Sequence, residues 1–573
     1  MTQDAYAYVR HYHYYYGWAM VIFWVVVVVI GLTHKLLAYW EISSKRSVNA
    51  QGRSSLWFKR NVVTPATFGQ RCVQDFGGWG TVPPRVQTLT LVLFLLLNIA
   101  CSVHGYRAFD GYAYAPIKGM QMLRHISDRT GVLSFANFPI IWLFGMRNNI
   151  VIWLTGWDFK TYNNFHRWVG RISMVEAVIH SIGYSVLLVW KSGWPYFWWM
   201  WTWTYWWTGE LATVFLCMIV GLSVFWFRRQ QYELFLVLHI GLSILILLGM
   251  LGHVSIFRGA YDPLVWIPVI IWALDRLARG ARIFAFSPRF WRAKATVTYN
   301  EDAHMVRVVV PLSSSLYDIQ PGTFYYLMVL NKWNFWESHP FTVASVSGSD
   351  CYGPEAEQSS PLLRPVPMTQ TTGYSEKSQR EMTFLIRPYE SFTARLKEYA
   401  EAEQPKPATL RVAIDGPYGK VLPLVNFDKV VFIVGGSGIV VPVSYLNMLT
   451  SSTRPESIEI HWAIRQPALA IDVLDRELRD ALGNERVKIS IYLTGVERRR
   501  TADEAIYKGV EWRSGRVNVE ETVDRALDAG EDGRLAVVTS GPGRMADETR
   551  RVVAARMVPS LPRVEYFEES FEW

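Results

Sequence analysis

Cysteine is scarce in this sequence of 573 residues, and its four cysteines lie far apart. They are Cys72, Cys101, Cys217 and Cys351, and no two of them form a CxxC pair. Disulfide frameworks and cysteine-based zinc sites both need cysteines at short, recurring spacings. The sequence therefore indicates neither a disulfide-stapled domain nor a zinc site of that kind.

Charged residues are scarce in the first half of the chain. No Asp, Glu, Lys or Arg occurs in 21–32, 89–100 or 240–251, whereas charged residues return at ordinary density after about residue 275. Long uncharged apolar stretches are typical of helices that cross a membrane. The sequence therefore predicts a membrane-embedded first half and a soluble, enzyme-like second half.

Acidic residues are outnumbered, and the formal net charge is +9. A basic protein can bind nucleic acid, but here Lys and Arg gather beside the apolar stretches. Positive charge in that place is typical of the cytoplasmic side of a membrane protein. We therefore expect the lipid bilayer as a partner and no nucleic acid.

Seven segments are expected to cross the membrane as helices, because each approaches the length of about 20 mostly apolar residues that the hydrocarbon core requires. They lie near 17–38, 86–103, 131–150, 165–190, 209–228, 232–254 and 263–283. A tyrosine-rich stretch at 12–16 precedes the first, where a cleavable leader would carry basic residues. We therefore expect the first segment to remain as an anchor.

Loop charge orients these seven expected spans. Basic residues concentrate after the first span, between the fifth and the sixth, and after the seventh, and these regions alternate correctly as cytoplasmic. Arg107, Lys118, Arg124 and Arg129, between the second and third spans, go against the rule. The majority places the soluble half in the cytosol and the aromatic-rich segment 190–207 at the opposite interface.

Four histidines stand inside the expected spans, where an ionisable residue is costly and usually functional. His166 and His180 are 14 residues apart in the fourth span, and His239 and His253 are 14 apart in the sixth. In a helix, 14 residues advance about 21 Å and return to within about 40° of the same face. We therefore predict that His166 faces His239 on the cytosolic side and His180 faces His253 on the outer side. Two stacked haems with paired axial histidines suit this arrangement.

Two alternatives remain for these histidines. Each of them could serve only in hydrogen bonding between packed helices, although the repeated interval disfavours four unrelated roles. A zinc site is disfavoured because its ligands must converge on one ion and no Cys or carboxylate accompanies these histidines.

A short strand-like segment stands in the second half. It consists of His339, Pro340, Phe341 and Thr342. The run 339–345 is similar to the flavin-binding motif of ferric reductases and NADPH oxidases, within the broader ferredoxin reductase fold. The resemblance implies an extended strand whose backbone amides and Thr342 hydroxyl lie along the flavin and its phosphates. An apolar strand ending at a proline turn looks much the same and is the alternative.

Two glycine-containing turns follow, on either side of the apolar strand 430–434. The first is Gly416, Pro417, Tyr418 and Gly419, and the second is Gly435, Gly436, Ser437, Gly438 and Ile439. Strand, glycine turn and helix make an anion site, because glycine lets the backbone approach a pyrophosphate and the helix N-terminus offers free amides. We expect both turns to bind cofactor.

Arg465 follows the strand-like run 458–464. A guanidinium in this position can bind a ribose 2′-phosphate through paired hydrogen bonds, which favours NADPH over NADH. A solvated arginine at the end of a strand is the alternative.

The end of the chain carries two catalytic candidates. The strand-like run 535–539 leads into Ser540, Gly541 and Pro542. This turn resembles the CGP turn near the nicotinamide in the ferric reductase family, with Ser540 standing where Cys is usual. The ending in Trp573 also resembles the family's ending, where a terminal aromatic often covers the flavin ring, and a frayed tail is the alternative.

The chain as a whole resembles a fungal-type ferric or cupric-chelate reductase of the ferric reductase and NADPH oxidase flavocytochrome b superfamily. The resemblance implies a seven-helix transmembrane di-haem domain, then a ferredoxin-reductase-like β-barrel FAD domain and an α/β NADPH-binding domain. The expected bounds are an N-terminal anchor and basic loop at 1–85, the haem domain at 86–285, the FAD domain at 286–425 with a disordered insertion near 347–380, and the NADPH domain at 426–573.

The resemblance also implies a function. Electrons would pass from cytosolic NADPH through FAD and two b-type haems to an extracytosolic ferric or cupric chelate, for iron uptake. The plasma membrane is the usual place for such enzymes, with an internal membrane as the alternative. A superoxide-producing NADPH oxidase shares the machinery, but the extra first span and the ending in Trp573 count against it. A non-catalytic membrane scaffold, for which Ser540 is the only hint, is a third interpretation.

Overall fold

A computed structural model describes most of the chain. The described residues are 3–43, 53–74, 77, 80–108, 117–312, 315–330, 336–347, 380–389, 391–495, 507, 509–528, 533–561 and 563–569. The predicted insertion at 347–380 lies outside them apart from its two end residues, and so does the predicted aromatic gate Trp573. Internal contacts divide the chain into two compact units, 1–50 with 75–278 and 51–74 with 279–573. The four predicted domain bounds stay a prediction.

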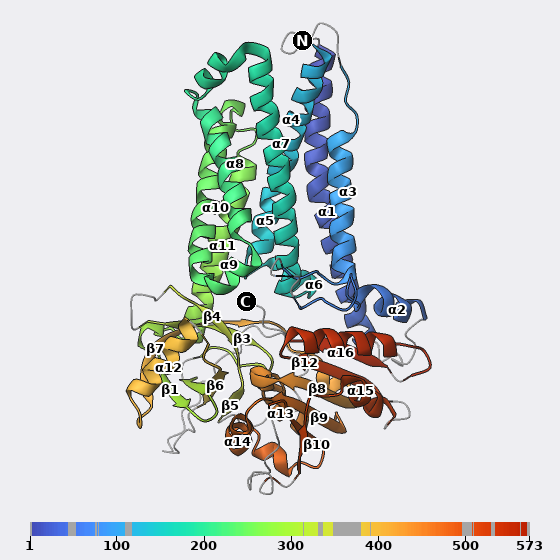
Figure 1. Cartoon of the computed structure of the whole chain (residues 1–573), viewed down its shortest axis with the longest axis vertical. Helices are drawn as coiled ribbons and strands as arrows, with labels where there is room; N and C mark the ends of the chain where they lie inside the picture. The colour runs from blue at the N-terminus through green and yellow to red at the C-terminus, as the bar shows by residue number, and fades with distance from the viewer. Residues whose placement is uncertain are drawn as a thin grey trace, which may run out of the picture. The chain divides into compact units, whose positions relative to one another are not determined.

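The first unit is a bundle of helices running side by side (Figure 1). The helices are α1 (Gln3–Ser43), α3 (Arg85–Val103), α4 (Lys118–Ala136), α5 (Phe138–Gly145), α6 (Ile150–Thr155), α7 (Phe159–Met200), α8 (Thr204–Leu222), α9 (Phe225–Gln230), α10 (Tyr232–Val254) and α11 (Pro263–Phe286), whose last residues belong to the second unit.

Aromatic side chains join four of these helices at one point. The Trp24 ring of α1 lies 5.1 Å from Phe94 of α3, 4.9 Å from Phe144 of α5 and 5.0 Å from Phe165 of α7, between ring centroids. Other apolar side chains of the same helices, such as Leu96 on α3, are exposed. A helix whose apolar residues point outward as well as inward is typical of a protein that lipid surrounds.

Among the residues that the structure describes, five helical segments are long and apolar enough to cross a membrane, where the sequence predicted seven. They are Tyr12–Leu37, Arg85–Val103, Phe159–Met200, Thr204–Leu222 and Tyr232–Phe257. The expected span 131–150 is divided, because α4 and α5 meet at Asn137, and the charged α4 buries Arg129 inside the bundle. The expected span 263–283 falls within α11, whose sequence includes Asp275 and several arginines.

The aromatic-rich segment 190–207 forms the end of α7 and the start of α8. The helix α7 extends further than the expected 165–190, and Gly193 interrupts it with a φ of 72°, a backbone conformation that glycine adopts without strain. A side chain on Gly119 of α4 would meet the Trp190 ring at 3.0 Å, so this part of α7 packs closely against α4.

The second unit contains an antiparallel barrel-like sheet. Its strands are β1 (Lys294–Asn300), β2 (Met305–Pro311), β3 (Phe324–Val329), β4 (His339–Thr342), β5 (Ser345–Ser347), β6 (Glu381–Ile386) and β7 (Ala408–Tyr418), and α12 (Phe392–Ala402) packs on them. The strand order is β4-β3-β7-β1-β2-β6-β5. Alternating side chains point to the core, as in β1, where Ala295 and Val297 are buried between more exposed neighbours.

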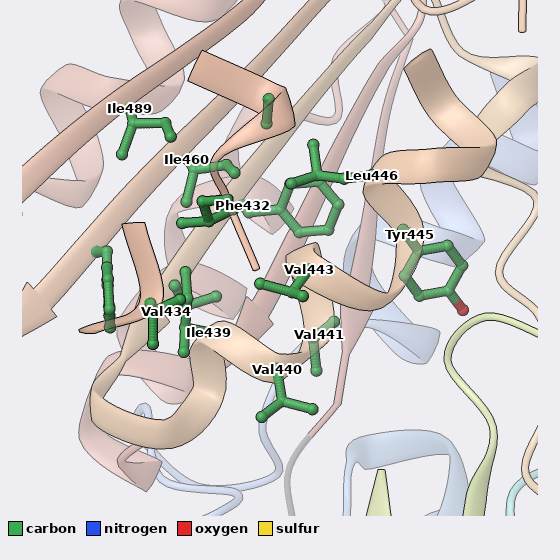
Figure 2. Close-up of a cluster of buried hydrophobic side chains, with 14 of the residues drawn as sticks. Phe432, Val434, Ile439, Val440, Val441, Val443, Tyr445, Leu446, Ile460 and Ile489 are labelled. Carbon is green, nitrogen blue, oxygen red and sulfur yellow. The ribbon is translucent and has the colours of Figure 1, made fainter. Parts of the chain in front are cut away.

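A parallel sheet with helices follows. Its strands are β8 (Lys429–Gly435), β9 (Ser457–Ile464), β10 (Val487–Leu493), β11 (Val510–Ser514), β12 (Leu535–Ser540) and β13 (Val564–Glu568), in the order β11-β10-β9-β8-β12-β13. The helices are α13 (Val440–Ser451), α14 (Pro467–Asp475), α15 (Val519–Asp528) and α16 (Gly543–Arg556). Strands buried on both faces read as continuous apolar runs, and Figure 2 shows Phe432 of β8 and Ile460 of β9 beside Leu446 of α13.

The barrel and the parallel sheet are fixed to each other by polar contacts. Arg307 of β2 donates hydrogen bonds to Asp472 at 2.9 Å and to Glu477 at 2.8 and 3.0 Å. The Gly322 amide donates to the Ser444 hydroxyl of α13 at 2.8 Å. The flavin motif and the nucleotide turns therefore belong to sheets that contact each other within the second unit. The segment 53–74, with α2 (Arg53–Phe58) and the π-helix η1 (Lys59–Val63), also belongs to this second unit.

Candidate functional site

The four histidines of the membrane unit form two facing pairs. The ring centroids of His166 on α7 and His239 on α10 are 6.0 Å apart. Those of His180 on α7 and His253 on α10 are 5.9 Å apart. Two imidazoles bonded at about 2 Å to opposite sides of one metal ion have ring centroids roughly 6 Å apart. The structure therefore brings together the pairs predicted from the 14-residue intervals, at a spacing that an iron ion fits.

Backbone carbonyls orient three of these rings through Nδ1. The Nδ1 atoms lie within hydrogen-bond distance of carbonyl oxygens as follows: His166 at 2.8 Å from Ile141, His180 at 2.7 Å from Ser127 and His253 at 2.8 Å from Tyr205. A carbonyl only accepts, so Nδ1 is the protonated nitrogen and the lone pair remains on Nε2. That is the usual arrangement of a metal-binding histidine. His239 differs, because its Nδ1 is buried without a hydrogen-bond partner in the described part of the chain.

Glycines leave room for these rings, and sequence reasoning missed them. A Cβ on Gly131 would lie 2.4 Å from Nδ1 of His180, and a Cβ on Gly209 would lie 2.3 Å from Nδ1 of His253. Any larger residue at these positions would displace the imidazole. The signal in the sequence was a glycine in a neighbouring apolar span, where small residues allow helices to approach closely.

The predicted flavin motif forms β4, at the edge of the barrel next to β3. The His339 ring stacks on Phe392, with centroids 4.5 Å apart and an interplanar angle of 24°. The Thr342 hydroxyl is buried and has no hydrogen-bond partner within the described residues. An unsatisfied buried hydroxyl costs about 1–3 kcal/mol, so a bound acceptor there, such as a flavin or its phosphates, would relieve that cost.

The sequence predicted a turn from Gly416 to Gly419, but β7 continues to Tyr418 because that residue pairs with Phe324 of β3. Two arginines near the end of α11 hold this end of the strand. Arg279 donates to the fully buried Asp415 at 2.9 Å, and Arg282 donates to the Pro417 carbonyl. The Tyr418 hydroxyl also donates to Asp415 at 2.8 Å, and burial together with that carboxylate raises the pKa of Tyr418 well above its ordinary value. A charged network in the interior therefore fixes the backbone of this predicted cofactor turn.

The glycine turn after β8, Gly435 to Ile439, packs directly on the turn after β12, Ser540 to Pro542, because β8 and β12 are neighbouring parallel strands. A Cβ on Gly438 would lie 2.3 Å from the Ser540 carbonyl oxygen, and one on Gly435 would lie 2.7 Å from Cδ of Pro542. The Ser540 hydroxyl is buried and lacks a hydrogen-bond partner among the residues that the structure describes. Only glycines let the two turns approach this closely, so the Ser540 hydroxyl lies beside the turn that the sequence predicted to bind phosphate.

The glycine turn itself runs from Gly435 through the short 3₁₀ helix η6 (Gly436–Ile439) into α13. Gly436 has a φ of 57°, which favours glycine, and its carbonyl accepts a 2.8 Å hydrogen bond from Nε1 of Trp462. The predicted order of strand, turn and helix is therefore present. It sits at the carboxyl ends of the parallel strands, where ligands bind in open α/β sheets.

Arg465 lies one residue beyond the end of β9, at the same carboxyl edge, and it is exposed. Sequence reasoning missed a second arginine. Nη1 of Arg387, which directly follows β6, would lie 3.7 Å from a Cβ on Gly436. A guanidinium there adds positive charge beside the turn. In the sequence, the only sign that Arg387 could lie near this turn was its position directly after a buried strand.

Three family models match the chain in the order of these sites. They are "Ferric reductase like transmembrane component" at 130–250, "FAD-binding domain" at 289–352 and "Ferric reductase NAD binding domain" at 427–554. The chain therefore contains a ferric-reductase-like membrane component followed by FAD-binding and NAD-binding domains.

Fungal reductases are similar along almost the whole chain. A "Probable ferric reductase transmembrane component" of Candida albicans is 26% identical, over 97% of this chain and 82% of that protein. "Ferric/cupric reductase transmembrane component 1" of the same species is 27% identical over 97% and 72%. "Ferric reductase transmembrane component 3" of Saccharomyces cerevisiae is 27% identical over 97% and 77%.

A ferredoxin NADP+ reductase from Neisseria gonorrhoeae aligns with 48% of this chain and 97% of its own, at 13% identity and a TM-score of 0.32. A TM-score this low carries no argument about the fold of this chain. The three family models in their order and the near full-length similarity confirm the resemblance stated from the sequence: this chain is similar to the ferric and ferric/cupric reductase transmembrane components of fungi.

Proposed function

We propose that this protein carries electrons from NADPH, through FAD and two b-type haems, across a membrane to a ferric or cupric chelate. The observation that carries the proposal is the pair of facing histidine sets, with centroids 6.0 and 5.9 Å apart, in a chain that also holds flavin- and nucleotide-binding domains. Fungal relatives named as ferric and ferric/cupric reductases support the choice of acceptor.

The cofactors supply the redox chemistry, hydride transfer at the nicotinamide and flavin and one-electron transfer at the haems. The chain supplies placement. His166 and His239 hold the inner iron, and His180 and His253 hold the outer one. Three Nδ1–carbonyl contacts keep Nε2 of His166, His180 and His253 available to the metal.

At the soluble end, the strand His339 to Thr342 and the end of β7, Gly416 to Gly419, would hold the FAD. The turn Gly435 to Ile439 binds the pyrophosphate of NADPH at the N-terminal end of α13. Arg465, on the same sheet edge, binds the 2′-phosphate and so selects NADPH over NADH. Gly541 and Pro542 shape the nicotinamide pocket, where Ser540 offers a hydroxyl and the terminal Trp573 covers the flavin.

We further propose seven spans, with α4–α5 and α11 added to the five apolar segments, and a cytosolic flavin and nucleotide half. The α4 helix satisfies its charge internally, since Arg129 donates to the carbonyls of Cys101 at 2.6 Å and His104 at 3.3 Å. Internal pairing of this kind lets a charged helix lie within a membrane. The plasma membrane is the proposed location, and the four domain bounds expected from the sequence are part of the proposal.

The test is anaerobic turnover of the purified protein, supplied with FAD, with NADPH and a ferric chelate. Haem absorbance and Fe(II) formation are recorded together. Haem reduction followed by Fe(II) formation is expected. Haem reduction without Fe(II), reversed only when oxygen is admitted, would instead identify a superoxide-producing oxidase.

A further inference from the structure

The segment 53–74, here called the docking arm, lies between α1 and α3 in the sequence, yet it packs against the nucleotide-binding end of the second unit. Ala66, Cys72 and Val73 of the arm form a buried apolar cluster with Ala546 of α16. Leu56 packs against the core beneath the parallel sheet. The arm is therefore part of the soluble fold in the described structure.

One carboxylate receives the end of the arm. Oδ1 of Asp547, on α16, accepts hydrogen bonds from the amides of Cys72 and Val73, both at 2.9 Å, and Oδ2 accepts from the amide of Gln74 at 3.1 Å. Asp547 is only 3% exposed. Three amides around one buried carboxylate form a specific bond network, because each hydrogen bond to a charged acceptor is stronger than a neutral one.

The same part of the arm touches the nicotinamide turn. A Cβ on Gly543, the first residue of α16, would lie 3.1 Å from Cγ1 and 3.2 Å from the carbonyl carbon of Val73, and 3.3 Å from the amide nitrogen of Gln74. Gly543 directly follows Gly541 and Pro542. The arm backbone therefore packs closely against Gly543, next to the Ser540–Pro542 turn, where the nicotinamide is expected to bind.

Further contacts join the arm to the strand that ends the described chain. Arg550 of α16 donates to the Thr64 carbonyl at 3.1 Å and also to Glu568 of β13. Lys59 lies 3.4 Å from Glu565 of β13. Burial opposes ionisation of Glu565, but Lys59 and Arg563 overcome it and hold the pKa of that carboxyl below its usual value. The arm thus contacts α16, which follows the nicotinamide turn, and β13, which pairs with β12, the strand that leads into that turn.

We propose that the docking arm positions the nicotinamide turn for hydride transfer, with Asp547 as the positioning residue. The inference rests on the proposed NADPH-to-FAD reaction and adds to it a part played by a loop between two membrane segments. In this proposal Asp547 does not contact the reacting atoms. It acts by holding residues 72–74 against Gly543 and so fixing the turn before it.

The decisive variants are Asp547→Ala and Asp547→Asn in the full-length protein loaded with FAD and haem. The first removes all three acceptors. The second keeps an oxygen for Cys72 and Val73 but turns an amide group toward the Gln74 amide. Glu548→Gln is the matched control, because Glu548 is the exposed neighbour on the same helix.

Flavin reduction is followed by anaerobic stopped-flow absorbance with NADPH and with NADPH deuterated at C4. A displacement of about 1 Å can slow a reaction by roughly 100-fold, so we expect Asp547→Ala to slow flavin reduction by about 10- to 100-fold. The deuterium isotope effect should rise while KM changes little. Asp547→Asn should fall between Asp547→Ala and the wild type, and Glu548→Gln should match the wild type.

Gly543→Ala tests the same contact with Asp547 intact, because the added methyl group pushes the arm backbone away from the turn. Gly483→Ala, where nothing lies within 4 Å of the added Cβ, is its control. A slower flavin reduction in Gly543→Ala with normal FAD content supports the proposal even if Asp547→Ala fails to fold.

Unchanged rates and isotope effects in folded, FAD-loaded Asp547→Ala would overturn the inference. Loss of FAD or of folding in both Asp547→Ala and Gly543→Ala would also overturn it, since the arm would then be purely structural. A wild-type protein whose flavin NADPH does not reduce would instead contradict the proposed function, so the two failures are distinguishable.

Discussion

The candidate sites of the two units are formed in different ways. The first unit, 1–50 with 75–278, is here called the membrane unit, and the second, 51–74 with 279–573, the soluble unit. In the membrane unit, two helices supply all four histidines, and the repeat of the helix itself sets their two depths. In the soluble unit, the site comes from the ends of β4, β7, β8, β9 and β12, and from α11 and the docking arm, which lie far apart in the sequence. The first site follows from periodicity along the chain, whereas the second follows from tertiary contacts.

This difference determines how each site should fail. The two facing histidine pairs of the membrane unit are separate from each other, so the loss of one histidine should remove a single cofactor and leave the other in place. A residue in the second unit supports several segments at once, so its replacement should disturb more than one part of the site. The substitutions below test this contrast from the largest expected effect to the smallest.

Replacing His180 by Ala should abolish Fe(II) formation while NADPH still reduces the remaining haem. The variant lacks one of the two residues proposed to hold the outer haem, but the His166–His239 pair is untouched. Haem content per protein and the NADPH-reduced spectrum measure this. Ser181→Ala, which removes only a 2.9 Å hydroxyl contact to Thr213, should keep both haems. Loss of both haems from His180→Ala would show that the pairs are not independent.

Replacing Arg279 by Ala should destabilise the second unit and release FAD, because Asp415 would remain buried without its cation. Breaking a buried ion pair from one side costs about 3–5 kcal/mol, and the partial exposure of Arg279 places the effect near the lower end. The temperature of flavin release measures it.

The double variant Arg279→Ala with Asp415→Asn should recover part of that loss, since no unpaired charge remains. Arg292→Ala, at an exposed position of the same unit, is the control. An equal loss in the single and the double variant would contradict the role given to charge.

Replacing Arg465 by Ala should weaken NADPH binding selectively. A charged hydrogen bond contributes about 1.5–3 kcal/mol, so KM for NADPH should rise about 10- to 100-fold while KM for NADH stays near its wild-type value. Steady-state kinetics with both nucleotides measure the ratio. Arg479→Ala, another exposed arginine of this unit, serves as the control. Equal increases for NADPH and NADH would reject the phosphate role.

Replacing Ser540 by Ala should have the smallest effect. Its buried hydroxyl has no partner within the described residues, so folding loses no hydrogen bond. Hydride transfer should slow only about 3- to 10-fold, the equivalent of one neutral hydrogen bond of about 1 kcal/mol. Stopped-flow flavin reduction measures the rate and thermal denaturation the stability. A marked loss of stability with an unchanged rate would assign Ser540 to the fold alone.

Sequence reasoning reached the histidine pairs because a helix converts a spacing of 14 residues into depth and face. It also located the turn at Gly435, because glycine marks such turns, but it read Gly416 to Tyr418 as a turn where β7 continues. It could not find Arg387 or the contact of Arg279 with Asp415, since these depend on which segments meet in space. No local pattern indicates that Asp547 would receive the amides of residues 72–74.

Of the seven predicted spans, five correspond to long apolar helices among the described residues, and the other two differ for a related reason. Hydropathy treats each segment alone, so 131–150 read as one apolar helix although the chain breaks at Asn137. The helix α4 begins before residue 131 and contains Arg129, which a hydropathy scale counts as a charge unsuited to a membrane. The scale does not account for the hydrogen bonds from Arg129 to carbonyls inside the bundle. Burial of a charge inside a bundle is a tertiary property.

The most direct test of the ordered electron path is the haem spectrum of His166→Ala under anaerobic conditions, first with NADPH and then with dithionite. The variant should lack the inner haem, so NADPH should leave the outer haem oxidised, whereas dithionite should reduce it. Reduction of the remaining haem by NADPH at the wild-type rate, or retention of two normal haems, would contradict the pairing and the order of transfer proposed here.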